Sequence, residues 1–196
     1  MMAVKQAQMG SLMRDVLGES YVSLDLRGVD NDQRYSAEKF ILVATLVDSR
    51  TGIERYVRGE GLGVVGVAFN ALVQALLDEY PSLESLQFHS FELEGFDETD
   101  QSSSSNESLP SAHLSVNNQV GHTFRFSASS RSVMTACIQV ALLAVEYFIN
   151  SEQAFYRIRG FLDEAKANDR PDLVDRYTHM LTQLVMNSLY SGLPKT

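Results

Sequence analysis

The chain has 196 residues and a formal net charge of −9, which leaves room for one domain of ordinary size or two small ones packed together. Its hydrophobic content of 44% is typical of a folded protein, and it excludes a disordered or fibrous one. Acidic residues outnumber basic ones and no basic patch stands out along the chain, so we expect no nucleic-acid partner.

The sequence also favours a cytoplasmic protein without a membrane span. A single cysteine, Cys137, cannot form an intrachain disulfide. Residues 1–10 lack the continuous apolar core of a secretory signal. The longest apolar run, residues 133–149, contains Gln139 and Glu146, which predicts a core helix.

The first half of the chain predicts strands followed by a helix. Alternating and apolar-periodic segments predict a helix over residues 9–17 and strands over residues 21–27, 39–47 and 53–58. Gly28 and residues 31–32 predict a turn between the first two strands, and a short glycine-containing turn joins the last two into a hairpin. From Val64 the apolar spacing becomes three and four, which predicts a helix to about Tyr80.

The same order of elements returns in the second half. The pattern predicts strands over residues 86–93, 112–116 and 122–126 and a helix over residues 132–150. Asn117, Asn118 and Gly121 are the turn residues of the second hairpin. We therefore predict an α+β fold of two βββα repeats with internal pseudo-symmetry.

The rest of the chain predicts a loop and additional C-terminal helices. Residues 96–111 are acidic and serine-rich with no basic residue, which predicts a mobile surface loop. Helical patterns follow over residues 152–167 and 171–190, and the last carries an apolar stripe that would pack on this chain's own sheet or on a dimer partner. We thus divide the chain into residues 1–150 and an appended segment, residues 151–196.

The strongest local signal is the glycine-rich segment Gly59–Gly63, at the end of a strand and the start of a helix. Free amides at a helix N-terminus attract a carboxylate or a phosphate, and glycines let a ligand come close to the backbone. A tight turn that packs the helix on the sheet explains the same glycines. Both interpretations stay open.

Other kinds of site have little support. Gly61, Gly63 and Gly66 match the letters of a dinucleotide fingerprint, but the strand before them alternates with charged residues and belongs to a hairpin. No spacing typical of a metal site joins the histidines, which are His89, His113, His122 and His179. We therefore predict no cofactor, no metal and no catalytic residue.

Residues 59–72, GEGLGVVGVAFNAL, resemble the G-x-G-x-G-P-V-x-A-x-x-x-A-L segment of the C-terminal regulatory (dimerisation) domain of 2-isopropylmalate synthase, to which a domain of citramalate synthase is related. The resemblance spans roughly residues 21–150. The second half is similar to that domain's second repeat, G-x-G-x-S-x-D-I-I-x-A-S. The residues in the corresponding places are Ser130, Val133, Met134, Ala136 and Cys137.

The chain departs from both motifs at particular positions. Val64 stands where the first motif has a proline, and Gly66 stands where it often has an acid. Phe126, Ala128 and Ser132 replace two glycines and the aspartate of the second motif. The family's catalytic TIM barrel and its metal-binding His-x-His pair are not found in this sequence, so the resemblance implies the regulatory half alone and no enzyme activity.

The resemblance implies a homodimer that binds an amino acid, leucine or isoleucine, near the dimer interface and acts on a separate synthase. It implies a ligand site formed by Gly61, Leu62, Gly63, Val64, Val65, Ala68, Phe88 and Phe91, with Ser130, Val133 and Ala136 in the second motif. In this site the helix N-terminus at Gly63 would hold the ligand's carboxylate. The alternative is a structural dimer scaffold or protein-interaction domain that has lost ligand binding.

Overall fold

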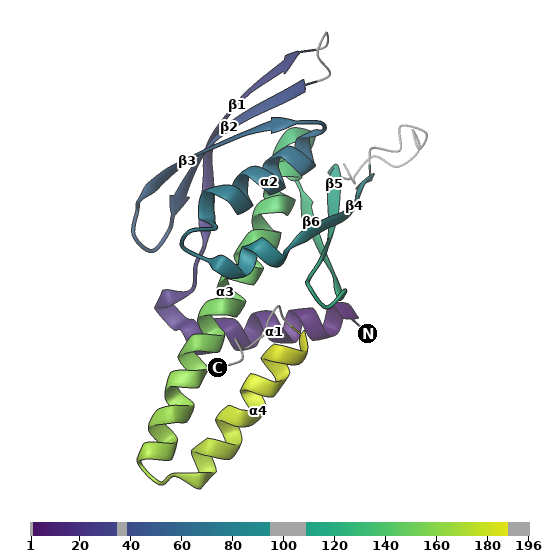
Figure 1. Cartoon of the computed structure of the whole chain (residues 1–196). Helices are drawn as coiled ribbons and strands as arrows, with labels where there is room; N and C mark the ends of the chain where they lie inside the picture. The colour runs from purple at the N-terminus through teal and green to yellow at the C-terminus, as the bar shows by residue number, and fades with distance from the viewer. Residues whose placement is uncertain (1, 35–38, 95–108, 188–196) are drawn as a thin grey trace, which may run out of the picture.

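The computed structural model describes residues 2–34, 39–94 and 109–187, and most of the predicted loop over residues 96–111 lies outside them. Two three-stranded antiparallel sheets are each followed by a helix, which confirms the α+β class and the repeated βββα order. Both sheets lie at one end of the molecule, and long helices extend from the other (Figure 1).

The first sheet has the order β1 (Leu24–Arg34), β2 (Lys39–Asp48) and β3 (Glu54–Gly61). Side chains on β2 alternate between buried and half-buried, as expected for a strand with one face on the core. The predicted turn at Gly28 and residues 31–32 is wrong because these residues lie within β1. β2 is long enough to pair with β1 as far as Arg34. The strand register shifts at a β-bulge between Leu26 and Gly28, so Gly28 marks a bulge within β1.

The second sheet has the order β4 (Gln87–Glu94), β5 (Ser111–Asn117) and β6 (Thr123–Ser129). Its β5–β6 hairpin turns where the sequence predicts. The side chain of Asn118 accepts hydrogen bonds from the backbone N–H groups of Val120 and His122, and Gly121 adopts a positive φ of 82°.

Two helices hold the sheets together. α2 (Val64–Leu76) packs against β2 and β3, α3 (Val133–Ala167) packs against β5 and β6, and the two helices pack against each other. α2 ends earlier than predicted, and the short 3₁₀ helix η3 (Pro81–Ser85) leads from it into β4. The core therefore lies between the sheets and these two helices, with Phe69, Leu72, Leu114 and Phe148 almost fully buried.

The helix after β6 does not end at Asn150 as predicted. α3 continues to Ala167, through the boundary that we drew between residues 150 and 151. No glycine or proline interrupts the sequence there. Asn150 is fully buried because the segment before β1 supplies its partners: its side chain accepts from the Val22 N–H at 2.7 Å and donates to the Val22 carbonyl at 2.8 Å.

The remaining helices pack on α3. α1 (Met2–Leu17) contacts α3 and, through the 3₁₀ turn η1 (Gly18–Ser20), leads toward the first sheet. α4 (Pro171–Asn187) runs back along the outer half of α3 and also contacts α1 (Figure 1). The stripe on α4 therefore packs on helices, and the expectation that it packs on a sheet is wrong.

α3 is long and apolar enough to cross a membrane by length and composition. In this fold 67% of its most apolar window is buried within the chain, where it packs on β5, β6 and α2. Its apolar sequence is thus explained by its position as the central core helix.

Candidate functional site

The glycine-rich end of β3 has a packing function at two of its positions. A Cβ on Gly59 would meet the Cβ of Ala71 at 2.7 Å, and a Cβ on Gly61 would meet a methyl carbon of Val67 at 3.2 Å. These glycines therefore let α2 lie directly on β3. Gly63 differs, because it caps α2 at a positive φ of 74° and nothing lies within 4 Å of its Cβ position.

The two repeats differ in how their helices begin. At α3, Ser132 is the N-cap residue, and its hydroxyl accepts a hydrogen bond from the Thr135 N–H at 3.3 Å. At α2 the N-cap residue is Gly63, which has no side chain to accept such a bond. The N-cap side chain therefore does not occupy the first amides of α2, and the positive end of the helix dipole favours an anionic acceptor there.

A pocket of about 640 Å³ lies beside this open helix end, within the usual range of roughly 300–1,000 Å³ for small-molecule sites. The N-terminal turns of α2 and α3 and the strand β4 form its walls. Its lining residues are Leu62, Gly63, Val64, Val65, Gly66, Asn70, Phe88, Phe91, Leu93, Val133, Met134 and Cys137.

The pocket brings together most of the residues implied by the resemblance. Those that line it are Leu62, Gly63, Val64, Val65, Phe88, Phe91 and Val133. Ala68 and Ala136 are fully buried in the core and are not among the lining residues. Gly61 packs on Val67, and Ser130 precedes the α3 cap, where its hydroxyl accepts a bond from the Ser132 N–H.

Sequence reasoning missed several lining residues although their spacing pointed to them. Leu93 is two positions after Phe91 on β4, so both side chains face the same side of the sheet. Asn70 and Cys137 each follow another lining residue, Gly66 and Val133, by one helical turn.

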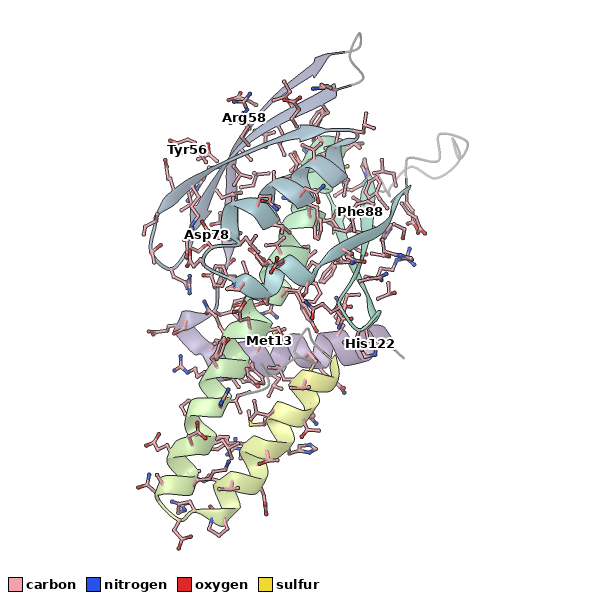
Figure 2. The ribbon with its side chains drawn as sticks, viewed as in Figure 1. Met13, Tyr56, Arg58, Asp78, Phe88 and His122 are labelled. Atoms are coloured by element: carbon pink, nitrogen blue, oxygen red, sulfur yellow. The ribbon has the colours of Figure 1, made fainter. Side chains whose placement is uncertain are left out.

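The rim of the pocket exposes large apolar side chains. Leu62 is 75% exposed, Leu93 49%, Val133 46% and Phe88 41%. Leu62 lies in the connection between β3 and α2, Val133 begins α3, and Phe88 and Leu93 lie on β4; all four line the pocket. Figure 2 shows Phe88 on β4 beside α2, whereas Tyr56 and Arg58 lie on the outer face of the first sheet. A contiguous exposed apolar surface marks a place where something binds.

Among the residues that the structure describes, no charged side chain lines this pocket. Asn70 supplies an amide, and Cys137 supplies a thiol whose pKa is raised by burial. The walls are otherwise apolar. The pocket therefore suits a small ligand with an apolar body, and the α2 amides suit a carboxylate on that ligand.

Metal binding and dinucleotide binding have little support in the part of the chain that the structure describes. No group of three or more His, Cys, Asp or Glu side chains there could hold a metal ion. His113 on β5 instead shares a hydrogen bond with Ser127 at 2.7 Å. β3 pairs antiparallel with β2, so it does not form the parallel βαβ unit that a dinucleotide fingerprint requires.

Comparison with known proteins does not identify a family or a relative for this chain. No model of a known protein family matches the chain, and no curated protein is significantly similar to it in sequence.

Proposed function

We propose that this chain is a non-catalytic, ligand-sensing regulatory and dimerisation module that binds a small amino acid of the leucine or isoleucine class. The observation that carries the proposal is the uncapped N-terminus of α2 at the edge of an apolar pocket. An anion-binding element and an apolar cavity meet there, which matches a ligand with one carboxylate and one branched aliphatic side chain.

In the proposed complex the ligand's carboxylate accepts hydrogen bonds from the first amides of α2. Its aliphatic side chain packs among Val65, Phe91 and Met134, which line the pocket. The side-chain oxygen of Asn70 is the acceptor for the ligand's ammonium group. A desamino analogue of the same ligand would lose this last interaction.

We further propose that two copies associate over the exposed rim of the pocket. The rim residues Leu62, Phe88, Leu93 and Val133 would lose their contact with water in such a dimer. A ligand between the copies favours the subunit packing that closes around it. A change in that packing is what a separate synthase would respond to.

Charge at the rim provides the test. Leu93→Glu places a negative charge on the wall of the proposed ligand pocket, on an edge strand where the side chain is already half-exposed. We expect titration calorimetry with leucine and isoleucine to show affinity weakened by about tenfold or more, since about 1.4 kcal/mol of repulsion has that effect. Ile53→Glu, at a 57% exposed residue that does not line the pocket, is the matched control.

A structural dimer scaffold is the second candidate, and the exposed rim favours it by itself. On this account the rim holds two copies together without a ligand. A dimer in sedimentation analysis that is dispersed by Leu93→Glu, combined with no heat from any branched-chain amino acid, would select the scaffold.

A further inference from the structure

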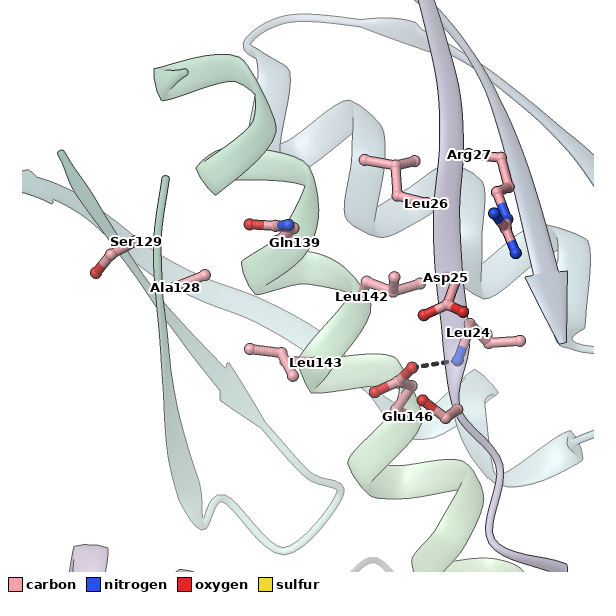
Figure 3. A pocket seen from close by; sticks show the side chains of 11 residues that line it. Leu24, Asp25, Leu26, Arg27, Ala128, Ser129, Gln139, Leu142, Leu143 and Glu146 are labelled. Atoms are coloured by element: carbon pink, nitrogen blue, oxygen red, sulfur yellow. Dashed lines mark hydrogen bonds between the residues drawn. The ribbon is translucent and has the colours of Figure 1, made fainter. Parts of the chain in front are cut away.

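Glu146 on α3 occupies an unusual position, away from the pocket described above. Its Oε1 accepts a hydrogen bond from the backbone N–H of Leu24 at 2.5 Å, at the first residue of β1. Figure 3 shows this bond, with the other carboxylate oxygen directed away from β1. One turn later on α3, Asn150 holds the backbone of Val22. Two side chains of α3 thus hold the approach to an edge strand.

The carboxyl group of Glu146 lies where two hollows meet. One hollow, of about 610 Å³, lies between β1, β6 and α3. The other, of about 740 Å³, lies between α1, β6 and α3. Both are lined by Ser23, Leu143 and Glu146. If Ser23 and Leu24 moved away from α3, the carboxyl group would be exposed to water from both sides.

The surroundings of Glu146 favour the protonated, neutral form of its carboxyl group. Burial is the main cause that raises the pKa of this carboxyl to about 7, and Asp25 on β1 raises it further. The Leu24 N–H and Arg14 on α1 act in the opposite direction. Among the described residues no salt bridge involves Glu146.

Other charged or titratable groups face the same hollows. Tyr21, before β1, lies in the second hollow beneath the guanidinium of Arg14. Tyr147 is the neighbour of Glu146 on α3. Arg27 on β1 lines the first hollow, and Arg125 on β6 lines the second but is paired with Glu92.

We propose that Glu146 is a proton-sensitive latch, which holds the start of β1 against α3 in acid and releases it as the pH rises toward neutrality. The two bonds from Asn150 to Val22 carry no titrating group, so they keep the preceding residue attached. The release is therefore confined to the backbone from Ser23 into β1. It joins the two hollows along the edge of the first sheet.

The direction follows from proton linkage. With the latch open, Glu146 is hydrated and titrates near its ordinary value of 4.5, whereas with the latch closed it titrates near 7. The closed state binds the proton more tightly, so its advantage is complete below the lower value and is lost as the pH approaches the higher one. Over that interval the equilibrium constant for opening rises by up to about tenfold per pH unit, and it then levels off.

Hydrogen exchange of the Leu24 amide, corrected for the intrinsic pH dependence of exchange, tests the proposal on the whole chain. We expect an added rise of up to about tenfold per pH unit between pH 5 and pH 7 in the wild type. Glu146→Gln keeps an acceptor for Leu24 but does not titrate, so the added rise should disappear. Glu164→Gln, at an exposed position on the same helix, should behave like the wild type.

Two further readouts keep the proposal open to refutation. The carboxyl carbon of Glu146 should titrate near pH 7 by NMR, and a midpoint near its ordinary 4.5 would overturn the proposal. The Leu114 amide, on β5 of the other sheet, reports opening of the whole fold. An equal added rise at Leu114 would overturn a latch confined to β1, as would an unchanged pH dependence in Glu146→Gln.

Discussion

Gly59 of β3 lies so close to Ala71 of α2 that a Cβ built on Gly59 would be 2.7 Å from the Cβ of Ala71. A second contact, at 3.0 Å, is to the backbone oxygen of Val67, which cannot rotate away as a side chain can. The helix that carries the proposed anion site is therefore seated on the sheet through a glycine. The position of its N-terminus depends on this contact.

We expect Gly59→Ala to destabilise the fold by about 1–3 kcal/mol, because the added methyl group forces α2 away from β3. Urea unfolding measures this change. Gly160→Ala is the control, since nothing lies within 4 Å of that position in α3. The control should stabilise the protein by up to about 1 kcal/mol through helix propensity. Equal effects of the two substitutions would contradict the packing function of Gly59.

Asn150 provides a second prediction. Its buried side chain makes two hydrogen bonds to Val22 and one to the Glu146 carbonyl. Asn150→Ala leaves the Val22 backbone groups buried without partners, which costs about 1–3 kcal/mol for each unsatisfied group. Asn168→Ala removes only a bond at the exposed end of α3 and should cost much less. A similar loss in both variants by thermal unfolding would argue against this interpretation.

A third prediction concerns acid stability. The side chain of Asp48 is 5% exposed and makes a two-point ion pair with Arg50. The hydrogen bonds from Arg50 are the main cause that lowers the pKa of Asp48 below its ordinary value of 3.8. Stability from this pair is therefore present above that value, and it is lost as the pH falls through the lower pKa of the folded state.

Asp48→Asn should accordingly cost about 2 kcal/mol at neutral pH, where the charged partner is lost. In strong acid the wild-type carboxyl is protonated and uncharged, as the asparagine amide is. The free energies of unfolding of the two proteins should therefore become equal. Asp163→Asn, at an exposed position in α3, serves as the control. A difference between Asp48→Asn and the wild type that stays constant from neutral pH to strong acid would rule out the proposed ion-pair effect.

Cys137 is a site for chemical labelling within the proposed ligand pocket. It is the sole cysteine of the chain, it is 3% exposed, and burial raises the pKa of its thiol. We expect slow reaction with a small alkylating reagent, and a rate several-fold lower with saturating leucine or isoleucine, because a bound ligand covers the thiol. Mass spectrometry gives the rates, with glycine as the control ligand. The same rate with and without leucine would place any bound leucine elsewhere.

Much of the fold was predictable because strand and helix periodicities are local signals. The β-branched residues of β2, such as Ile41, Val43 and Thr45, predict a strand directly from the sequence. The turn at Gly28 was wrong because a glycine marks a bulge as readily as a turn, and the length of the partner strand decides between them. That length is a tertiary property.

The other wrong or missed predictions also concern residues whose positions depend on tertiary contacts. Asn150 reads as a helix end, yet it lies inside α3 because the Val22 backbone, 128 positions away in sequence, satisfies its side chain. The pocket was partly predictable from the glycine segment at the start of α2. Met134 was missed as a lining residue because it reaches the pocket only through the packing of α3 against α2.

The central claim is that the open end of α2 and its apolar pocket bind a small amino acid. Titration calorimetry of the wild-type protein with leucine, isoleucine and valine tests it most directly, with glycine and the desamino analogue of leucine as comparisons. The account predicts saturable binding of at least one branched-chain amino acid, weaker binding of its desamino analogue and none of glycine. No heat from any of them, with a protein shown to be folded by circular dichroism, would contradict the claim.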